Sequence, residues 1–209
     1  MCGIVGYIGN NNPSNVVIAG LKRLEYRGYD SAGIALFDAG EIEVTRALGK
    51  LEQLKLALDG NESSATLGIG HTRWATHGKP SENNAHPHTA GRVSLIHNGI
   101  IENYIELKQE LSKQGRDFLS ETDTEIAAHL LDSKLEQGLE PFDALKAACA
   151  EIRGSYAFVA FDKQNPDRLL VAKNSSPIIV GLKGSEVFIA SDIPALLEHT
   201  RDNIILEDG

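Results

Sequence analysis

Cys2 is the residue whose position gives its side chain the most distinctive chemistry. Its small side chain permits removal of Met1, which leaves a thiol and a free α-amine on one residue. The amine has a reference pKa of about 7.7–8.0 and the thiol about 8.5, so the amine can accept the thiol proton near neutral pH. This is the N-terminal-amine form of an activated nucleophile. Because many proteins carry a cysteine at position 2 by chance, other segments must decide the interpretation.

A polar segment from His71 to Gly78 directly follows an apolar stretch, which is typical of a site loop. Arg73 offers a planar guanidinium suited to a small carboxylate, and a surface ion pair is the alternative. Trp74 is the single tryptophan of the chain, for which a core or interface position is the alternative.

Two further segments supply groups suited to a reacting amide. Asn98 and Gly99 follow a predicted strand, and an asparagine amide beside a backbone N–H is a good donor pair for an oxyanion. Asn-Gly is also a common turn, so that interpretation stays open. Asp123 lies at a predicted helix start, where it either stabilises the helix dipole or binds a substrate ammonium group.

The histidines raise the alternative of a metalloenzyme. His71, His77, His86, His88 and His97 lie close together in the sequence, so a metal site must be considered. However, the H-E-x-x-H pattern is absent, and His86 and His88 have a loop spacing with a proline between them. Phosphate-binding and dinucleotide-binding glycine motifs are also absent. We therefore expect no metal and no cofactor.

Composition narrows the partners. The 20 Lys and Arg residues against 29 Asp and Glu give a net charge of -9, which disfavours nucleic acid and anionic lipid as partners. Two distant cysteines disfavour a disulfide scaffold and indicate the cytoplasm, and we expect Cys149 to be a small buried hydrophobe. The N-terminus lacks the pattern of a secretory signal, and no apolar run approaches the roughly 20 residues of a membrane span.

The pattern of apolar residues and turn signals predicts an α+β fold in one domain, residues 1–209, with mainly antiparallel strands. A helix capped by Ser14 should end near Tyr26, with Gly28 beyond it. The second of the later helices opens with a capping-box pattern at Thr122 to Glu125. The other predicted elements are strands at 32–37, 41–47, 67–72, 93–97, 156–161, 169–172, 178–180 and 187–190, and helices at 102–114, 122–137 and 141–152.

Several long motifs occur in order along the chain. They are Cys2 to Gly6, Leu24 to Gly33, His71 to Gly78, Asn84 to His88, His97 to Asn103 and Ser120 to Glu125. Together they resemble the glutaminase domain of the class II, N-terminal-nucleophile amidotransferases, and within that class the glucosamine-6-phosphate synthase branch. The resemblance covers essentially all 209 residues. Amidophosphoribosyltransferases, a sister family, carry His-Arg-Gly-Gln-Asp at Tyr26 to Asp30 and Tyr-Ser-Thr at Trp74 to Thr76.

The resemblance implies a four-layer αββα sandwich and a set of roles. Cys2 attacks the glutamine side-chain amide to form a γ-glutamyl thioester, which water hydrolyses to glutamate after ammonia has left. Asn98 and Gly99 stabilise the oxyanion, while Arg73 and Asp123 hold the α-carboxylate and α-ammonium of L-glutamine. The supporting residues implied in the same way are Thr76 and His77 as pocket lining, and Arg27 and Trp74 as neighbours, with Trp74 in a loop that gates the site.

The resemblance also implies a larger parent enzyme. Relatives of this branch continue into sugar isomerase domains that receive the ammonia and convert fructose-6-phosphate to glucosamine-6-phosphate, and we expect this chain to be the glutaminase part alone. A homodimer is an option for the full-length enzyme. The alternatives are the glutaminase domain of another class II amidotransferase, such as an amidophosphoribosyltransferase, and an inactive glutamine-sensing module.

Overall fold

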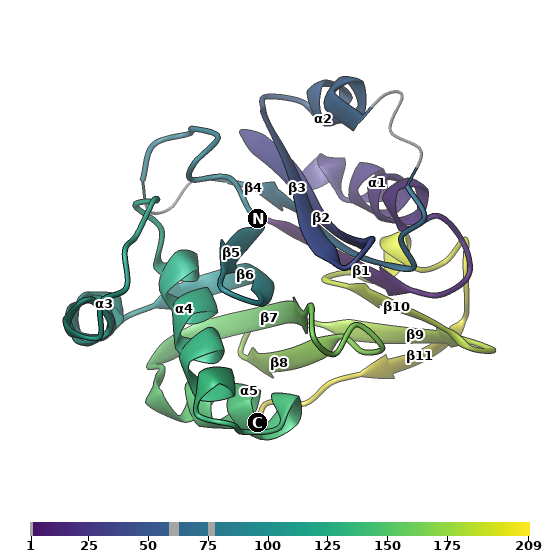
Figure 1. Cartoon of the computed structure of the whole chain (residues 1–209). Helices are drawn as coiled ribbons and strands as arrows, with labels where there is room; N and C mark the ends of the chain where they lie inside the picture. The colour runs from purple at the N-terminus through teal and green to yellow at the C-terminus, as the bar shows by residue number, and fades with distance from the viewer. Residues whose placement is uncertain (1, 59–62, 75–77) are drawn as a thin grey trace.

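The computed structural model describes residues 2–58, 63–74 and 78–209, in which eleven strands form two sheets (Figure 1). The first sheet has the order β11-β9-β10-β1-β4-β2-β3 and the second the order β5-β6-β7-β8. Every pairing between these strands is antiparallel, as predicted. The strands are β1 (Gly3–Ile8), β2 (Ser31–Asp38), β3 (Glu41–Leu48), β4 (Leu67–Arg73), β5 (His88–Ala90), β6 (Val93–Ile101), β7 (Gly154–Asp162), β8 (Leu170–Asn174), β9 (Ile179–Lys183), β10 (Glu186–Ala190) and β11 (Asp202–Ile205).

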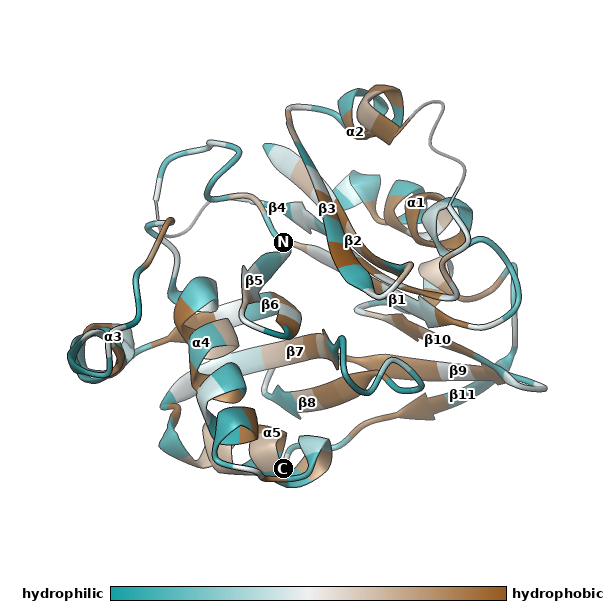
Figure 2. Cartoon of the chain, in the orientation of Figure 1, coloured by the Kyte–Doolittle hydropathy of each residue, from teal (hydrophilic) through white to brown (hydrophobic). Residues whose placement is uncertain are grey.

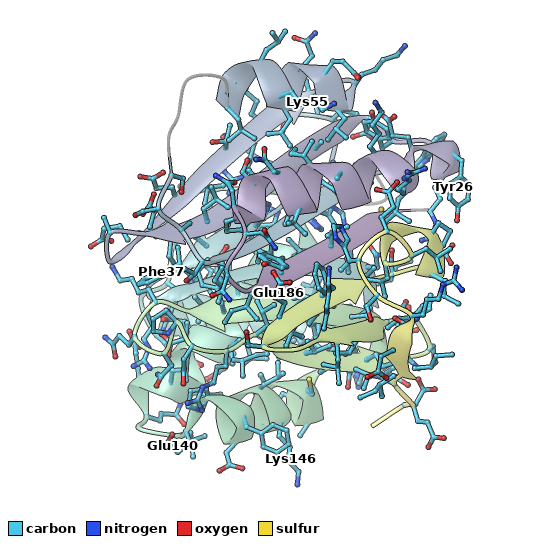
Figure 3. All side chains as sticks on the ribbon, turned by 90° about the vertical axis from the view of Figure 1, so that its right-hand side faces the viewer. Tyr26, Phe37, Lys55, Glu140, Lys146 and Glu186 are labelled. Carbon is cyan, nitrogen blue, oxygen red and sulfur yellow. The ribbon has the colours of Figure 1, made fainter. Side chains whose placement is uncertain are left out.

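Helices cover the outer face of each sheet. Those of the described residues are α1 (Pro13–Arg23), α2 (Leu51–Leu58), α3 (Tyr104–Lys113), α4 (Asp123–Glu136) and α5 (Pro141–Glu151), with short 3₁₀ helices η1 (Glu25–Arg27) and η2 (Ile193–Ala195). Figure 3 places Lys55 of α2 and Lys146 of α5 at opposite ends of the molecule, on the two outer helix layers. The predicted α+β class and the αββα layering are confirmed.

The strands build three apolar layers because successive side chains point to opposite faces. On β7, Phe158 packs towards the helices α4 and α5, whereas Val159 packs between the two sheets. On β2, Ile34 packs under α1 and Ala35 lies between the sheets. Apolar positions appear as brown segments along β7, β9 and β10 in Figure 2. The core therefore has one layer between the sheets and one under each helical layer.

The chain changes sheet between β8 and β9. β8 ends at Asn174 on the second sheet, and β9 begins at Ile179 on the first. The sequence predicted these short strands but not this crossover. Residues Ser176 and Pro177 of the connection reach the candidate site described below.

Two predicted boundaries are wrong, each for a local reason. Asn12 caps α1 in place of Ser14, since its side-chain oxygen accepts a hydrogen bond from the Asn15 N–H at 3.2 Å. Pro13 then occupies the first helical position, where its missing N–H costs nothing. The helix ends at Arg23, and η1 continues the chain to Gly28, which has the positive φ of 72° expected beyond a helix end.

The cap of α4 is confirmed in part. Thr122 Oγ1 accepts a hydrogen bond from the Glu125 N–H at 3.3 Å. The Glu125 carboxylate does not return to the Thr122 N–H, as a capping box requires. It accepts from the N–H groups of Leu119 and Ser120 at 2.8 and 2.7 Å, and so orders the segment that leads into the helix.

The described residues include no helix that is both long enough and apolar enough to cross a lipid bilayer.

Candidate active site

The apolar layer between the sheets becomes polar at one end. On β4, Leu67 and Ile69 belong to this layer, and the period of two places His71 and Arg73 on the same face. On β6, Ile96 belongs to the layer, so Asn98 faces it as well. The two sheets therefore bring these polar side chains, far apart in sequence, to one place.

Cys2 lies at this polar end, immediately before β1. The half-buried Sγ accepts a hydrogen bond from the Trp74 N–H at 3.2 Å and lies 3.6 Å from the Trp74 carbonyl oxygen, to which the thiol donates. Burial raises the pKa of the Cys2 thiol, while the Trp74 N–H and the charge of Arg73 act in the opposite direction. A thiol in this environment needs a base close by to become a nucleophile. Met1 lies outside the described residues.

The Cys2 carbonyl oxygen is held by two donors. Asn98 Nδ2 donates to it at 3.1 Å and Arg27 Nη1 at 3.3 Å. Arg27 is itself fixed, because Nη2 forms an ion pair with Asp192 at 2.6 Å and Nη1 donates to Ser191 Oγ at 3.2 Å. Arg27 therefore supports the backbone that carries the nucleophile.

Asn98 and Gly99 do not form the turn that the sequence left open. They lie within β6, opposite Ala157 and Tyr156 of β7, because the ladder continues beyond the predicted strand end at His97 as far as Ile101. Gly99 has a φ of 139°, and a Cβ placed there would lie 2.1 Å from the Ser155 carbonyl oxygen. Only glycine fits this position.

Arg73 and Asp123 provide opposite charges. Both are almost fully buried, at 3% and 4% exposure. Arg73 Nη2 donates to the Gly78 carbonyl at 3.3 Å, and Asp123 Oδ2 accepts from the Ile101 N–H at 2.8 Å. Asp123 is also the first residue of α4, where a carboxylate is favoured by the helix dipole. A zwitterionic amino acid needs such a pair of charges.

These groups line one pocket of about 410 Å³. Seven of the nine predicted site residues contribute to it, namely Cys2, Arg27, Arg73, Trp74, Asn98, Gly99 and Asp123. The other two, Thr76 and His77, lie outside the described residues. Trp74 is 56% exposed, so it is no core residue, and its ring packs so closely over Gly28 that a Cβ there would lie 2.6 Å away.

Sequence reasoning missed several residues of this pocket. They are His86, His97, Ile100, Thr122, Thr124, Ser155, Ser176 and Pro177. His97 faces the helical layer, where its Nδ1 lies 3.1 Å from Thr124 Oγ1. The alternation along β6 separates His97 from Asn98 and is a signal that the sequence contained. The contribution of the β8–β9 connection had no such signal.

The clustered histidines are buried and mutually packed. His71 and His86 have ring centroids 4.1 Å apart, and His86 and His88 5.0 Å. Burial lowers the pKa of His71 to about 3 and the pKa values of His86 and His88 well below the usual range. Within the part of the chain that the structure describes, no three His, Cys, Asp or Glu side chains are arranged to hold a metal ion.

Residues 71–198 match the family described as the glutamine amidotransferase domain. The chain belongs to this family. This glutamine amidotransferase domain is also 50% identical over its whole length to a protein from Pyrococcus horikoshii named glutamine–fructose-6-phosphate aminotransferase (isomerizing). A protein of the same name from Gluconobacter oxydans is 51% identical. The domain spans only 35% and 34% of these two relatives.

Two solved structures share the fold of the domain. One is glutamine phosphoribosylpyrophosphate (PRPP) amidotransferase from B. subtilis complexed with ADP and GMP, with a TM-score of 0.84 and 26% identity. The other is described as the allosteric regulatory enzyme of purine biosynthesis, with a TM-score of 0.86 and 26% identity. Each comparison covers the whole domain and 46% of the solved chain.

Proposed function

We propose that this domain hydrolyses L-glutamine to L-glutamate and ammonia through a thioester on Cys2. The observation that carries the proposal is the common pocket of Cys2, Asn98, Arg73 and Asp123, in which a nucleophile, an oxyanion donor and two opposite charges converge. Its volume of about 410 Å³ lies in the range of pockets for small molecules.

The first step is attack by Cys2 Sγ on the side-chain carbonyl carbon of glutamine. The α-amine of Cys2, freed by removal of Met1, takes the thiol proton and delivers it to the leaving nitrogen, so ammonia departs and a γ-glutamyl thioester remains. Asn98 Nδ2 and the Gly99 N–H stabilise the oxyanion of the tetrahedral intermediate. Water then attacks the thioester, which releases glutamate and restores the thiol.

Substrate binding follows from the charges of the pocket. Arg73 binds the α-carboxylate and Asp123 the α-ammonium, which fixes the distance from the amino-acid end to the reacting amide. Thr76 and His77 line the same pocket, and Trp74 gates it. Arg27 acts through the backbone of Cys2 rather than on the substrate.

In the parent enzyme, the ammonia converts fructose-6-phosphate to glucosamine-6-phosphate on sugar isomerase domains. The identity of about 50% to relatives named glutamine–fructose-6-phosphate aminotransferase supports this acceptor over PRPP, because the PRPP amidotransferase is only 26% identical. We further propose a homodimer in the cytoplasm for that enzyme, with the domain forming residues 1–209 of its chain.

The test combines intact mass with glutaminase activity. The purified chain should lack Met1, release glutamate and ammonia in equal amounts, and gain one adduct from an electrophilic glutamine analogue. Cys2→Ala should abolish both turnover and labelling. Cys149→Ala, a variant of the other cysteine on α5, is the matched control and should retain both. Full turnover by Cys2→Ala would refute the mechanism, and an inert chain with an intact fold would favour the sensing module.

The acceptor is tested on the full-length protein that contains this domain. We expect it to form glucosamine-6-phosphate from glutamine and fructose-6-phosphate, and no phosphoribosylamine from glutamine and PRPP. The opposite result would place the domain in the amidophosphoribosyltransferase family.

A further inference from the structure

His71 lies directly behind the proposed oxyanion donor. Its Nε2 is 2.9 Å from Asn98 Oδ1, and the bond joins β4 of the first sheet to β6 of the second. The His71 side chain is fully buried, at 0% exposure. The two flanking positions on the same face of β4 are Ile69, which packs in the apolar layer, and Arg73, which lines the pocket.

The chemistry of the neighbours fixes the orientation of the Asn98 amide. The Cys2 carbonyl oxygen can only accept a hydrogen bond, so the group 3.1 Å from it must be the NH₂ of Asn98. The Asn98 oxygen therefore faces His71, and His71 Nε2 must carry a hydrogen. A neutral imidazole then has no hydrogen on Nδ1, and the structure places no hydrogen-bond partner at this buried atom among the described residues.

The His71 ring is held in this position by its surroundings. The His86 ring packs against it at 4.1 Å between centroids, with 33° between the planes. The His86 carbonyl oxygen in turn lies where a Cβ on Gly33 would be only 2.2 Å away, so His86 is packed tightly against β2. His71 therefore has little freedom to rotate away from Asn98.

We propose that His71 is a positioning residue for the glutaminase reaction, which holds the Asn98 amide with its NH₂ directed at the oxyanion. Without His71, the buried Asn98 oxygen loses its partner, and the amide gains a second orientation in which the oxygen faces the developing negative charge. The effect belongs to the transition state, since Asn98 donates to charge that forms only there. The inference rests on the proposed function.

The test compares substitutions that keep or remove the donor. Glutamine places an N–H near the position of the histidine Nε2, whereas leucine has none and asparagine is too short to reach. We expect His71→Leu and His71→Asn to lower kcat by about 10- to 100-fold, less than the loss for a complete oxyanion donor. The KM for glutamine should change less than about threefold, because the α-carboxylate and α-ammonium sites are intact. His71→Gln should recover most of the lost kcat.

A double-mutant cycle separates positioning from a general effect on the fold. If His71 acts through Asn98, His71→Leu should cost almost nothing further in an Asn98→Ala background. Full multiplication of the two losses would overturn the proposal. His129→Leu, which removes a half-buried imidazole of α4 packed on Phe118, is the matched control and should leave kcat unchanged.

A readout independent of turnover uses ¹⁵N NMR of the imidazole rings. His71 should show the neutral Nε2–H tautomer from pH 7 to pH 5, and a charged ring or the Nδ1–H tautomer would overturn the proposal even if His71→Leu fails to fold. An inactive parent chain would refute the proposed function. An active, Cys2-dependent chain in which His71→Leu keeps full kcat would refute only the role of His71.

Discussion

Asn98 Nδ2 donates a hydrogen bond to the carbonyl oxygen of Cys2 at 3.1 Å, so the oxyanion donor is tied to the residue that carries the nucleophile. One side chain thus both orders the N-terminal backbone and points its NH₂ at the reaction centre. We expect Asn98→Ala to lower kcat by about 10²- to 10³-fold, the usual loss for one oxyanion donor.

The isosteric variant Asn98→Asp makes this prediction sharper. It places an oxygen against the Cys2 carbonyl oxygen, so it should lower the thermal midpoint of unfolding as well as kcat, whereas Asn98→Ala should affect kcat more than stability. Steady-state kinetics and thermal unfolding of both variants provide the measurement. Equal kcat for Asn98→Asp and the parent chain would contradict the assignment.

Arg73 should act on substrate binding rather than on the chemical step. Arg73→Lys keeps the charge but loses the planar fork, so we expect the KM for glutamine to rise by about tenfold with a smaller change in kcat. The measurement is repeated with glutamine α-amide, which lacks the carboxylate. The difference between Arg73→Lys and the parent chain should largely disappear with that substrate, and its persistence would argue against the role.

Asp123 offers an isosteric test of ammonium binding. Asp123→Asn keeps an oxygen for the Ile101 N–H, which donates to the carboxylate at 2.8 Å, and removes the charge. We expect a fall in kcat/KM of about 10- to 100-fold for glutamine, the scale of a hydrogen bond to a charged group. With glutaramate, which lacks the α-ammonium, the parent chain and the variant should be equally slow. A larger loss with glutaramate would indicate a structural role.

Gly99→Ala should destabilise the chain because the new Cβ meets backbone. The Ser155 carbonyl oxygen would lie 2.1 Å from that Cβ, and φ is 139°. We expect a loss of about 2–4 kcal/mol in the free energy of unfolding, measured with urea. The control is Gly115→Ala, which has a φ of 84° but open space around the new Cβ, and it should cost about 1 kcal/mol. Equal losses would contradict the steric explanation.

Acid should destabilise the fold through the buried histidines. Burial lowers the pKa of His71 to about 3 from an ordinary value of 6.5, so between these values the unfolded chain binds a proton that the folded chain does not. Stability from His71 is therefore present at pH 7 and falls as the pH drops below 6.5, by about 2 kcal/mol at pH 5. His86 and His88 act in the same direction.

Urea unfolding at pH 7, 6 and 5 measures this dependence, in a range where most carboxylates stay ionised. His71→Gln should reduce the slope by up to one proton. A free energy of unfolding that is constant from pH 7 to pH 5 would show that the histidines take up protons in the folded chain.

The sequence predicted the layers of the fold well where alternation and turn signals were strong. The hairpin of β2 and β3 across Ala39 and Gly40 is confirmed, since Asp38 pairs with Glu41. β1 was missed because Gly3 and Gly6 interrupt its apolar pattern. Both glycines are needed for packing, as a Cβ on Gly3 would lie 2.6 Å from Thr72 Oγ1 and one on Gly6 3.2 Å from Val159. Short or exposed elements, namely α2, β5 and β11, were also missed.

For the candidate site, residue types alone gave alternatives that the fold resolves. Arg73 is buried in the pocket, which excludes the surface ion pair, and Asn98 lies in a strand, which excludes the turn. The partnership of His71 and Asn98 was beyond sequence reasoning, because it depends on how two sheets stack. Pairing across sheets leaves no periodic signal in either strand.

The place of β1 in its sheet has a consequence for biosynthesis. β1 is the first strand to leave the ribosome, yet its neighbours are β4 and β10, and the Ile4 N–H donates to Ser191, 187 positions later. Such non-local pairing is slow and must wait for distant parts of the chain. The reactive thiol at its start therefore meets its partners only when translation of the domain is nearly finished, and a nascent or truncated chain does not hold an assembled glutamine site.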